Sequence, residues 1–355
     1  MRPGQALRER VLLLGRAERW SGLLHSERAY GSVTRAGPRF RFAPTPSHAL
    51  HLGNAAAALI GWARARAREG AFIVRVEDID GGRSRPEFIE GGLDALEWLG
   101  LDWDEGPRSG GGYGPYLQSQ RLALYDQRLL ELEASGDTYA CTCSRADIRA
   151  AQRAPHLHTG EEAPYPGTCR PPTGAPATGE LAEDRGGMRL HVERLGDDAV
   201  VRWEDRWRGS QREDVRATCG DVLLGRAQRP TYQLAVVTDD IAMDITDVVR
   251  GEDLLGSTAR QILLYRALGA APPRFAHHPL LVDESGRKLS KRDGSISMDS
   301  HRAAGRAPGE VLALLGRGLG LVSSQVRTMK PSDWIELLAS DDLGWSSGPL
   351  PEVLS

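Results

Sequence analysis

The pattern of hydrophobic and polar residues in the first third of the chain predicts alternating strands and helices. Residues 39–43 alternate between arginine and apolar side chains and predict a short strand. Residues 54–69 are rich in alanine and predict a helix. A second strand at 72–76 and a helix at 86–99 follow. This order of strand, helix, strand and helix predicts an α/β fold with a parallel sheet.

The rest of the chain has a less regular pattern. Residues 106–116 are rich in glycine and predict a loop, and residues 139–187 are polar, rich in proline and glycine and short of apolar positions. We expect the second stretch to be an insertion with little core of its own. Further predicted elements are a helix at 121–134, short strands within 188–224, a buried strand at 232–237, a helix at 258–268, a strand at 280–282 and helices at 308–319 and 331–339.

Composition narrows the class of protein without identifying it. Of the 355 residues, 40% are hydrophobic and 26% are charged, which is typical of a globular protein with roughly two domains. No apolar stretch approaches the roughly 20 residues of a membrane span, and four cysteines are too few for a disulfide scaffold. We therefore expect a reducing, cytoplasmic location and no membrane partner. Residues 1–37 lack a secretory apolar core and remain an extension of unknown purpose.

Lysine is scarce, and its positions mark one segment. Among 45 basic residues, only Lys288, Lys291 and Lys330 are lysines. Two ammonium groups close together on a loop after a predicted strand suit a polyphosphate whose charge shifts during a reaction. An exposed basic loop is the simpler interpretation, but the scarcity of lysine favours a functional role.

Two further segments have the chemistry of a binding site. His51, Gly53 and Asn54 lie where a strand gives way to a helix, and helix N-termini bind phosphate through free N–H groups. A turn with Asn54 as the N-cap residue explains the same pattern. Residues 77–80 bring three carboxylates to the end of a predicted strand, where they are able to receive an ammonium group. A solvated strand end is the alternative there.

Three cysteines of the polar insertion indicate a metal site. Cys141, Cys143 and Cys169 supply three thiols, whereas zinc takes four ligands that are usually Cys or His. His156 and His158 are the ordinary candidates for the fourth position. A segment with little core benefits from a metal cross-link, which favours zinc over three unliganded thiols.

Together these segments resemble a class I aminoacyl-tRNA synthetase of the glutamyl type. Residues 51–54 (HLGN) are similar to the family's HIGH motif, and residues 288–292 (KLSKR) are similar to its KMSKS loop. The resemblance covers about residues 39–300 and implies a Rossmann-like catalytic domain with a zinc-bearing insertion and a short helical tail. Segments 41–46, 75–80 and 116–121 and the residues Tyr232 and Arg250 follow in the family's order. The implied divisions are two catalytic halves at 38–135 and 226–300, an insertion at 136–225 and a tail at 301–355.

The resemblance also implies a reaction. L-Glutamate and ATP, with Mg²⁺, would give glutamyl-adenylate and pyrophosphate without tRNA. The glutamyl group would then pass to the queuosine base at the wobble position of tRNA(Asp), as in the branch of the family that has no anticodon-binding domain. Roughly 55 residues follow the 288–292 segment and its flank, too few for such a domain. The alternative is a truncated glutamyl-tRNA synthetase that charges the 3′ end of tRNA(Glu), and a non-catalytic tRNA-binding relative is a third interpretation.

The family's motifs further imply a role for individual residues. Lys291, with help from Lys288, would stabilise the charge on the departing pyrophosphate, and His51 would hold phosphate. His48 replaces a glycine that the family usually has in the turn before His51. The implied residues are Arg41, Ala43, Thr45, Glu77, Tyr232 and Arg250 for glutamate; Pro44, His51, Gly53, Asn54, Lys288, Ser290 and Lys291 for ATP; and Cys141, Cys143, Tyr165 and Cys169 for one structural Zn²⁺, with Tyr165 in place of a histidine.

Overall fold

The computed structural model describes residues 37–144, 146–148, 164–172, 186–226, 229–282, 297–343 and 345. Most of the predicted extension at 1–37, the predicted zinc candidates His156 and His158, and the lysines of the 288–292 segment lie outside the described residues. None of the helices in the described ranges combines the length and the apolar character that crossing a bilayer requires.

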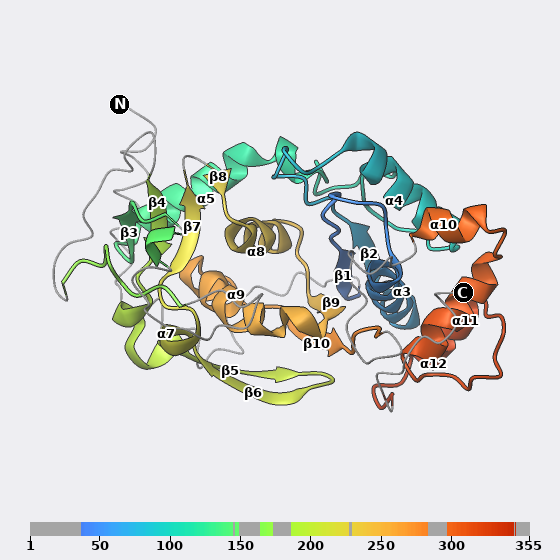
Figure 1. Ribbon diagram of the computed structural model, residues 1–355. Coiled ribbons are helices and arrows are strands. Elements are labelled where there is room, and N and C mark those ends of the chain that lie inside the picture. Colours follow the sequence, from blue (N-terminus) through green and yellow to red (C-terminus); the bar gives the residue numbers. More distant parts are fainter. Residues whose placement is uncertain are drawn as a thin grey trace.

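The centre of the molecule is a six-stranded sheet (Figure 1). Its strands are β1 (Arg39–Phe42), β2 (Ala71–Val74), β5 (Val200–Asp205), β6 (Gly209–Asp214), β9 (Asp247–Gly251) and β10 (Arg274–His278). They lie in the order β2-β1-β9-β10-β5-β6, and all neighbours are parallel except β5 and β6. The parallel α/β fold predicted from the alternating pattern is therefore confirmed. The β5–β6 hairpin, although it comes from within residues 136–225, extends this central sheet.

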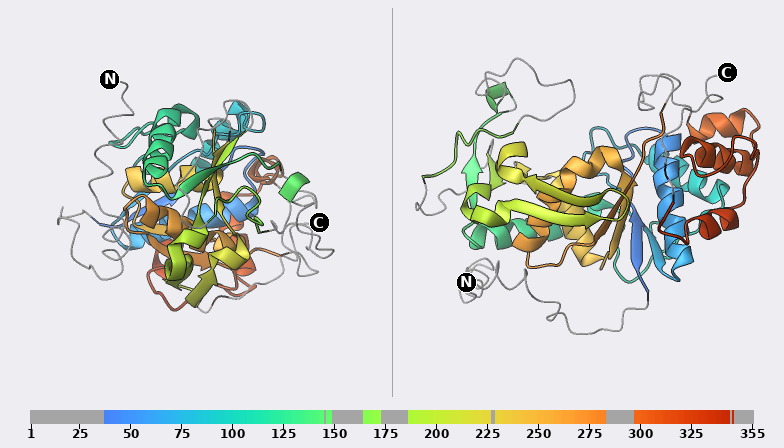
Figure 2. Two further views of the ribbon diagram at one scale, coloured as in Figure 1. Left: turned by 90° about the vertical axis from the view of Figure 1, so that its left-hand side faces the viewer. Right: turned by 90° about the horizontal axis from the view of Figure 1, so that it is seen from below.

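Helices cover both faces of the central sheet (Figure 2). Phe72 and Val74 of β2 pack on the face covered by α3, and Ile73 between them packs on the opposite face with residues of α8 and α9. This alternation follows from the two-residue period of a strand. The helices of these layers are α3 (Leu52–Ala67), α4 (Pro86–Trp98), α8 (Tyr232–Ala242), α9 (Leu255–Ala267), α11 (Pro308–Gly318) and α12 (Pro331–Leu337).

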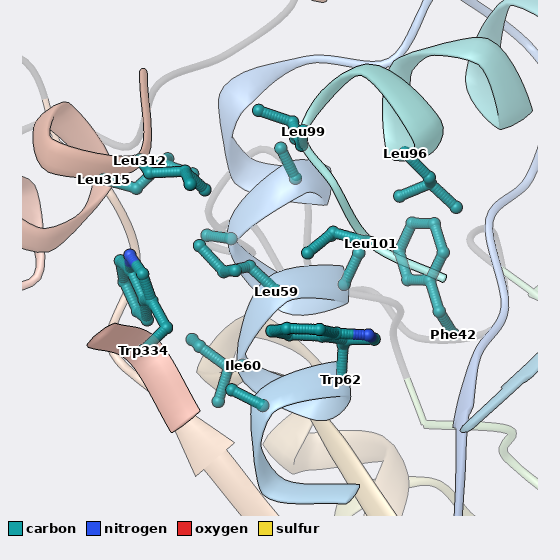
Figure 3. Packing of buried hydrophobic residues seen from close by; sticks show 14 of the residues in the cluster. Phe42, Leu59, Ile60, Trp62, Leu96, Leu99, Leu101, Leu312, Leu315 and Trp334 are labelled. Carbon is teal, nitrogen blue, oxygen red and sulfur yellow. The ribbon is translucent and has the colours of Figure 1, made fainter. Parts of the chain in front are cut away.

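Helix α3 is buried on most of its circumference. Its many alanines let neighbouring elements approach closely, and its larger side chains fill the space between the sheet and the C-terminal helices. Figure 3 shows Leu59 and Ile60 of α3 near Leu315 of α11 and Trp334 of α12. Arg64, in the same helix, donates hydrogen bonds to the carbonyls of residues 338 and 340 at 2.8 and 2.7 Å. The C-terminal tail is thus tied to the helix that begins at the predicted phosphate site.

A second, smaller sheet of four antiparallel strands lies at one end of the molecule (Figure 1). Its strands are β3 (Thr138–Cys141), β4 (Gly187–Leu190), β7 (Val222–Arg226) and β8 (Arg229–Pro230). The remaining elements are α5 (Leu122–Ala134), α7 (Val215–Thr218), α10 (Met298–Ala303) and the short 3₁₀ helices η1 (Gln118–Gln120), η2 (Val192–Ala199) and η3 (Glu252–Leu254).

Two predicted strands are wrong. Residues 232–237 form the first half of α8, which begins after Thr231, whose Oγ1 accepts from the N–H of Leu234 at 3.5 Å. A short apolar run does not distinguish a buried strand from a buried helix. The strand predicted at 280–282 is instead β10, which ends at His278. The two histidines at the end of β10 conceal the strand, because they interrupt the apolar run that predicts a buried strand.

Candidate active site

The predicted glutamate-site residues lie where parallel strands of the central sheet end. Ala43, Pro44 and Thr45 directly follow β1, Glu77 comes shortly after β2, and Arg250 lies in the last part of β9. The N–H of Glu77 donates to the Pro44 carbonyl at 2.9 Å, which holds the two segments side by side. Open α/β sheets bind their ligands at the carboxyl ends of strands.

His51 caps the N-terminus of α3. Its Nδ1 accepts from the N–H groups of Gly53 at 3.1 Å and Asn54 at 3.4 Å, so the predicted N-cap residue, Asn54, is wrong and His51 takes that position. A Cβ at Gly53 would lie 3.1 Å from Cε1 of His51, so a glycine here makes room for the imidazole. Because Nδ1 is an acceptor, the neutral ring carries its proton on Nε2 and has a donor there. A donor at a helix N-terminus is suited to a phosphate oxygen.

His48 occupies the position of the family's glycine without backbone strain. Glu69 and Asp244 are the non-glycine residues with positive φ in the described ranges, so His48 has an ordinary backbone conformation. Its ring is stacked on Phe88 of α4, with 6.5 Å between the ring centroids. The turn before His51 therefore does not depend on glycine.

The segment that carries the lysine pair ends beside His51. Residues 288–291 are outside the described ranges, and the described chain resumes at Ser297. Ser297 forms an antiparallel bridge with His51, and the N–H of Met298 donates to the Leu50 carbonyl at 2.8 Å. The C-terminal end of this segment is thus anchored at the N-terminus of α3.

Segment 116–121 fixes two acidic side chains near the site. Ser119 donates to Asp78 through its N–H at 2.8 Å and its hydroxyl at 2.6 Å. Gln118 and Arg121 donate to the two carboxylate oxygens of Asp239 at 2.7 and 2.6 Å. Asp78 is therefore engaged within the protein. The third carboxylate of the 77–80 segment, Asp80, forms an exposed ion pair within the same loop.

Glu77 is the carboxylate of that segment that remains for a ligand. Its side chain is 6% exposed, and its one hydrogen bond given by the structure is a long contact of 3.4 Å with Nη2 of Arg75. Burial raises the pKa of Glu77 to about 7, although the positive charges of Arg75 and Arg41 act in the opposite direction. The group therefore exchanges its proton near neutral pH, and a bound cation would favour its ionised form.

A buried network of arginines and acids supports Glu77 from the α8 side. Arg75 is fully buried and contacts Asp240 at 2.6 Å and Asp239 at 3.6 Å, and Arg41 contacts Asp240 at 3.3 Å. Tyr265 donates to the same Asp240 at 3.1 Å. When Glu77 is ionised, positive and negative charges balance in this network, which consists of Arg41, Arg75 and Arg121 with Glu77, Asp239 and Asp240.

Arg250 differs from these arginines because its partners are neutral. Its Nε donates to Nε2 of His277 at 3.0 Å, Nη1 to Gln261 at 2.8 Å and Nη2 to Thr258 at 2.9 Å. The side chain is 4% exposed, and no carboxylate of the described residues lies within ion-pair distance of it. Burial lowers the pKa of Arg250, which nevertheless remains a cation.

Tyr232, the first residue of α8, lies close enough to other predicted residues of the glutamate site for their charges to affect it. Its ring is 39% exposed, but the protein around it displaces much of the surrounding water. This desolvation, followed by the negative charge of Glu77, raises the pKa of Tyr232, whereas Arg250 and Arg41 act to lower it. The structure therefore brings Arg41, Glu77, Tyr232 and Arg250 into one electrostatic neighbourhood.

The cysteine cluster is able to hold a metal ion. The Sγ atoms of Cys141, Cys143 and Cys169 lie within 4.8 Å of one another, and the Tyr165 hydroxyl is 3.4 Å from Cys141 Sγ and 3.8 Å from Cys143 Sγ. Ligand atoms around a tetrahedral zinc lie roughly 3.5–4 Å apart, so these four side chains have suitable spacing. Arg189 donates from Nε to Cys141 Sγ at 3.2 Å and stacks 3.7 Å from the Tyr165 ring centroid, which supplies positive charge beside anionic ligands.

Sequence reasoning missed four buried side chains that hold the site in place. Asp239 and Asp240 anchor the arginine network from α8, and His277 and Asp205 connect Arg250 to the hairpin strand β5. The available signal for the aspartates was a pair of adjacent acids in an otherwise apolar run. The His277–Asp205 pair had no comparable signal, because its members are far apart in the sequence.

Comparisons of the sequence and of the structure with known proteins find similarity to tRNA synthetases in each case. The family model for the catalytic domain of class I tRNA synthetases (E and Q) matches residues 39–330. A glutamyl-Q tRNA(Asp) synthetase of Symbiobacterium thermophilum is 47% identical over 296 residues, which cover 83% of this chain and 90% of that protein. A glutamate–tRNA ligase of Thermosynechococcus vestitus is 44% identical over 287 residues, which cover 75% of this chain and 54% of the ligase. The crystal structure of a glutamate–tRNA synthetase from Elizabethkingia anophelis matches with a TM-score of 0.70 and 29% identity, over 84% of this chain and 65% of that one.

Proposed function

Because the chain belongs to the class I tRNA synthetases of the E and Q type, we propose that it activates L-glutamate with ATP and transfers the glutamyl group to tRNA. Membership in this class makes the protein a ligase whose substrates are ATP, an amino acid and a tRNA. The family and its Rossmann-like catalytic fold agree with the interpretation of the HLGN and KLSKR segments. For the acceptor, we propose the queuosine base of tRNA(Asp).

One observation supports glutamate above all others: the buried carboxylate of Glu77 and the buried cation of Arg250 lie at the same edge of the sheet. In this proposal Glu77 receives the α-ammonium group, and Arg250 receives a carboxylate through its planar, two-pronged guanidinium. In the same proposal, the Tyr232 hydroxyl and the strand end at residues 43–45 complete the contacts. Arg41, which already pairs with Asp240, contributes positive charge at longer range.

Activation of the amino acid needs no protein nucleophile, because the substrate carboxylate itself attacks the α-phosphate. The protein's contribution is positioning and charge stabilisation. His51 Nε2 and the N–H groups at the start of α3 would hold phosphate oxygens, and Mg²⁺ bound with ATP would neutralise phosphate charge. Lys291 precedes Ser297 by six residues, which span at most about 20 Å. This length of chain is compatible with the proposed role of Lys291 at the α3 N-terminus.

The choice of acceptor is supported by the comparisons. The chain is slightly more similar to the glutamyl-Q tRNA(Asp) synthetase of S. thermophilum than to the ligase of T. vestitus, and it matches 90% of the former but 54% of the latter. Transfer to a base rather than to a 3′-terminal ribose would use the same adenylate. Both tRNA and ATP are cytoplasmic substrates, which is where we place the activity.

A labelling experiment with purified tRNAs tests the proposal. The protein is incubated with ATP and radiolabelled glutamate in the presence of tRNA(Asp) with queuosine, tRNA(Asp) without queuosine, or tRNA(Glu). We expect label on queuosine-bearing tRNA(Asp) alone. Label on tRNA(Glu) alone would establish the truncated glutamyl-tRNA synthetase instead. The absence of glutamate-dependent ATP–pyrophosphate exchange by the wild-type protein would leave only a non-catalytic tRNA-binding role.

For the insertion, we propose one structural Zn²⁺ held by Cys141, Cys143, Tyr165 and Cys169. The spacing of the four ligand atoms and the positive charge of Arg189 beside them support this set. When bound, the metal would cross-link β3 to the 164–172 segment, in a part of the chain with few apolar residues.

A further inference from the structure

Arg250 is a buried arginine without a carboxylate partner among the described residues. Arg41, Arg75 and Arg121 each contact a carboxylate, whereas Arg250 is just as buried and has only neutral partners in the described part of the chain. It donates hydrogen bonds to His277, Thr258 and Gln261, and its guanidinium lies 5.3 Å from the centroid of the Phe275 ring. A buried cation without compensation is expensive. The structure must therefore contain a feature that makes an unpaired arginine acceptable at this position.

The hydrogen bonds around His277 define which of its nitrogens carries the proton. Arg250 Nε always donates, so His277 Nε2, 3.0 Å away, must accept and carries no proton. The Thr258 hydroxyl, 3.3 Å from the same Nε2, accepts from Arg250 and is free to donate its own proton to the ring. In a neutral imidazole the proton is then on Nδ1, which faces Oδ2 of Asp205.

Asp205 is fixed so that it can only accept from this ring. Its other oxygen, Oδ1, receives three backbone N–H groups: those of His277 at 3.2 Å, Trp207 at 3.1 Å and Arg208 at 3.1 Å. Burial alone would raise the pKa of Asp205, but the hydrogen bonds from His277 and from these backbone groups outweigh it, so the pKa lies below its usual value. Burial also lowers the pKa of His277, which favours the neutral ring.

We propose that Asp205 and His277 are positioning residues that present Arg250 to a substrate carboxylate with its charge uncompensated. His277 holds the guanidinium through an acceptor that has no charge, and the balancing negative charge of Asp205 is kept one imidazole ring away. Arg250 has five N–H donors, of which three are used, so two remain for a ligand within the described surroundings. A carboxylate of glutamate accepts both, whereas the amide of glutamine lacks the charge and offers one acceptor atom. The inference rests on the proposal that glutamate is the substrate.

The Asp205→Asn substitution tests the proposal through the tautomer. Because three backbone N–H groups point at Oδ1, the asparagine oxygen must take that place and its NH₂ group must face His277 Nδ1. Nδ1 then becomes an acceptor, the ring proton moves to Nε2, and two donors face each other at Arg250. We expect the KM for glutamate to rise about 10- to 100-fold, as for loss of a hydrogen bond to a charged group, while the KM for ATP changes less than about 3-fold.

Substitutions of His277 provide an independent comparison. His277→Phe keeps the stacking on Phe275 but removes the acceptor, and it should raise the KM for glutamate as much as Asp205→Asn. His277→Gln places an amide oxygen near the former Nε2 and should recover most of the affinity. The matched control is His191→Phe, which removes an equally buried histidine that packs edge-on against Tyr139 in the smaller sheet, and it should leave both KM values unchanged.

The outcomes separate this inference from the proposed function. If wild-type protein shows glutamate-dependent exchange and the Asp205 and His277 variants keep the wild-type KM for glutamate, or raise both KM values together, the positioning role is wrong and the function stands. If the wild type shows no exchange, the function fails. In that case ¹⁵N NMR of the histidine ring still tests the geometry: we expect a pyridine-type Nε2 for His277 in the wild type and a pyrrole-type Nε2 in Asp205→Asn. A wild-type His277 protonated on Nε2 would overturn the inference directly.

Discussion

Replacing Glu77 with glutamine is expected to make the protein more stable at alkaline pH and to weaken its use of glutamate. The carboxylate is 6% exposed, and burial raises its pKa from the usual 4.5 to about 7. A glutamine of the same shape does not ionise. The substitution therefore removes the free-energy cost of burying a charge, and with it the group that would bind the substrate ammonium.

The pH dependence of this stabilisation follows from the two pKa values. At pH 5 the folded protein keeps the proton on Glu77, whereas the unfolded chain has largely lost it, so protonation favours the folded state. At pH 8 the carboxylate is ionised in both states, and this contribution is gone. With 1.36 kcal/mol for each pKa unit, the wild type should lose about 2 to 3 kcal/mol of unfolding free energy between pH 5 and pH 8 relative to Glu77→Gln.

Urea unfolding of both proteins at the two pH values measures this difference. The change between pH 5 and pH 8 is more informative than either value alone, because any pH-independent effect of the substitution, such as the weakened contact with Arg75, cancels. The control is Glu87→Gln on α4, where the Glu87 side chain is 62% exposed. The stability difference between this variant and wild type should be the same at both pH values within about 0.5 kcal/mol. A stability difference between Glu77→Gln and wild type that is the same at both pH values would refute the reasoning. In exchange assays, kcat/KM for glutamate should fall at least about 30-fold, as for loss of one partner of a buried charge pair.

Three further substitutions test other parts of the structure. Lys291→Ala should reduce the rate of ATP–pyrophosphate exchange by about two orders of magnitude or more without changing urea unfolding, because a charge partner of the departing pyrophosphate is lost. An exchange rate in this variant equal to that of wild type would exclude the loop from catalysis. Cys141→Ser should lower the metal content of the purified protein by about one equivalent in elemental analysis. Wild-type protein that is purified without bound metal would contradict the zinc assignment. Asp239→Asn should lower the unfolding free energy by about 3 to 5 kcal/mol, since buried Arg121 loses its charged partner and buried Arg75 loses the more distant of two aspartates. The exposed Asp80→Asn should cost less than about 1 kcal/mol, and equal effects of the two substitutions would contradict the buried network.

The elements that the sequence predicted well are those with local signals. Helix α3 is rich in alanine and ends shortly before Gly70, and α4, α11 and α12 each begin with a proline at the first helical position. Strand β1 alternates between arginine and phenylalanine, and β2 is a short apolar run. By contrast, β10 carries two histidines, and the position of β5 beside it depends on pairing across about 70 residues of sequence. No local pattern encodes such a neighbour.

The same distinction applies to the candidate site. Arg41, Glu77 and Arg250 were identified because each lies in a segment that matches a family motif, and the structure brings them together near the ends of three strands. Their roles remain proposals. Asp205 and His277 lie 72 residues apart and match no motif that we used. Their importance arises only after folding, when a backbone turn orients a carboxylate toward a ring that in turn faces Arg250.

The charges of the site suggest why a substrate with both signs of charge would bind well. The network of Arg41, Arg75 and Arg121 is balanced only when Glu77 is ionised, and at neutral pH Glu77 is close to half-protonated. A ligand that brings an ammonium group would complete its ionisation, and a carboxylate on the same ligand would compensate Arg250. An amine alone would leave the buried guanidinium unpaired, and a carboxylic acid alone would leave Glu77 without its cation. Each half of an acidic amino acid therefore removes a separate electrostatic cost, and only the whole molecule removes both.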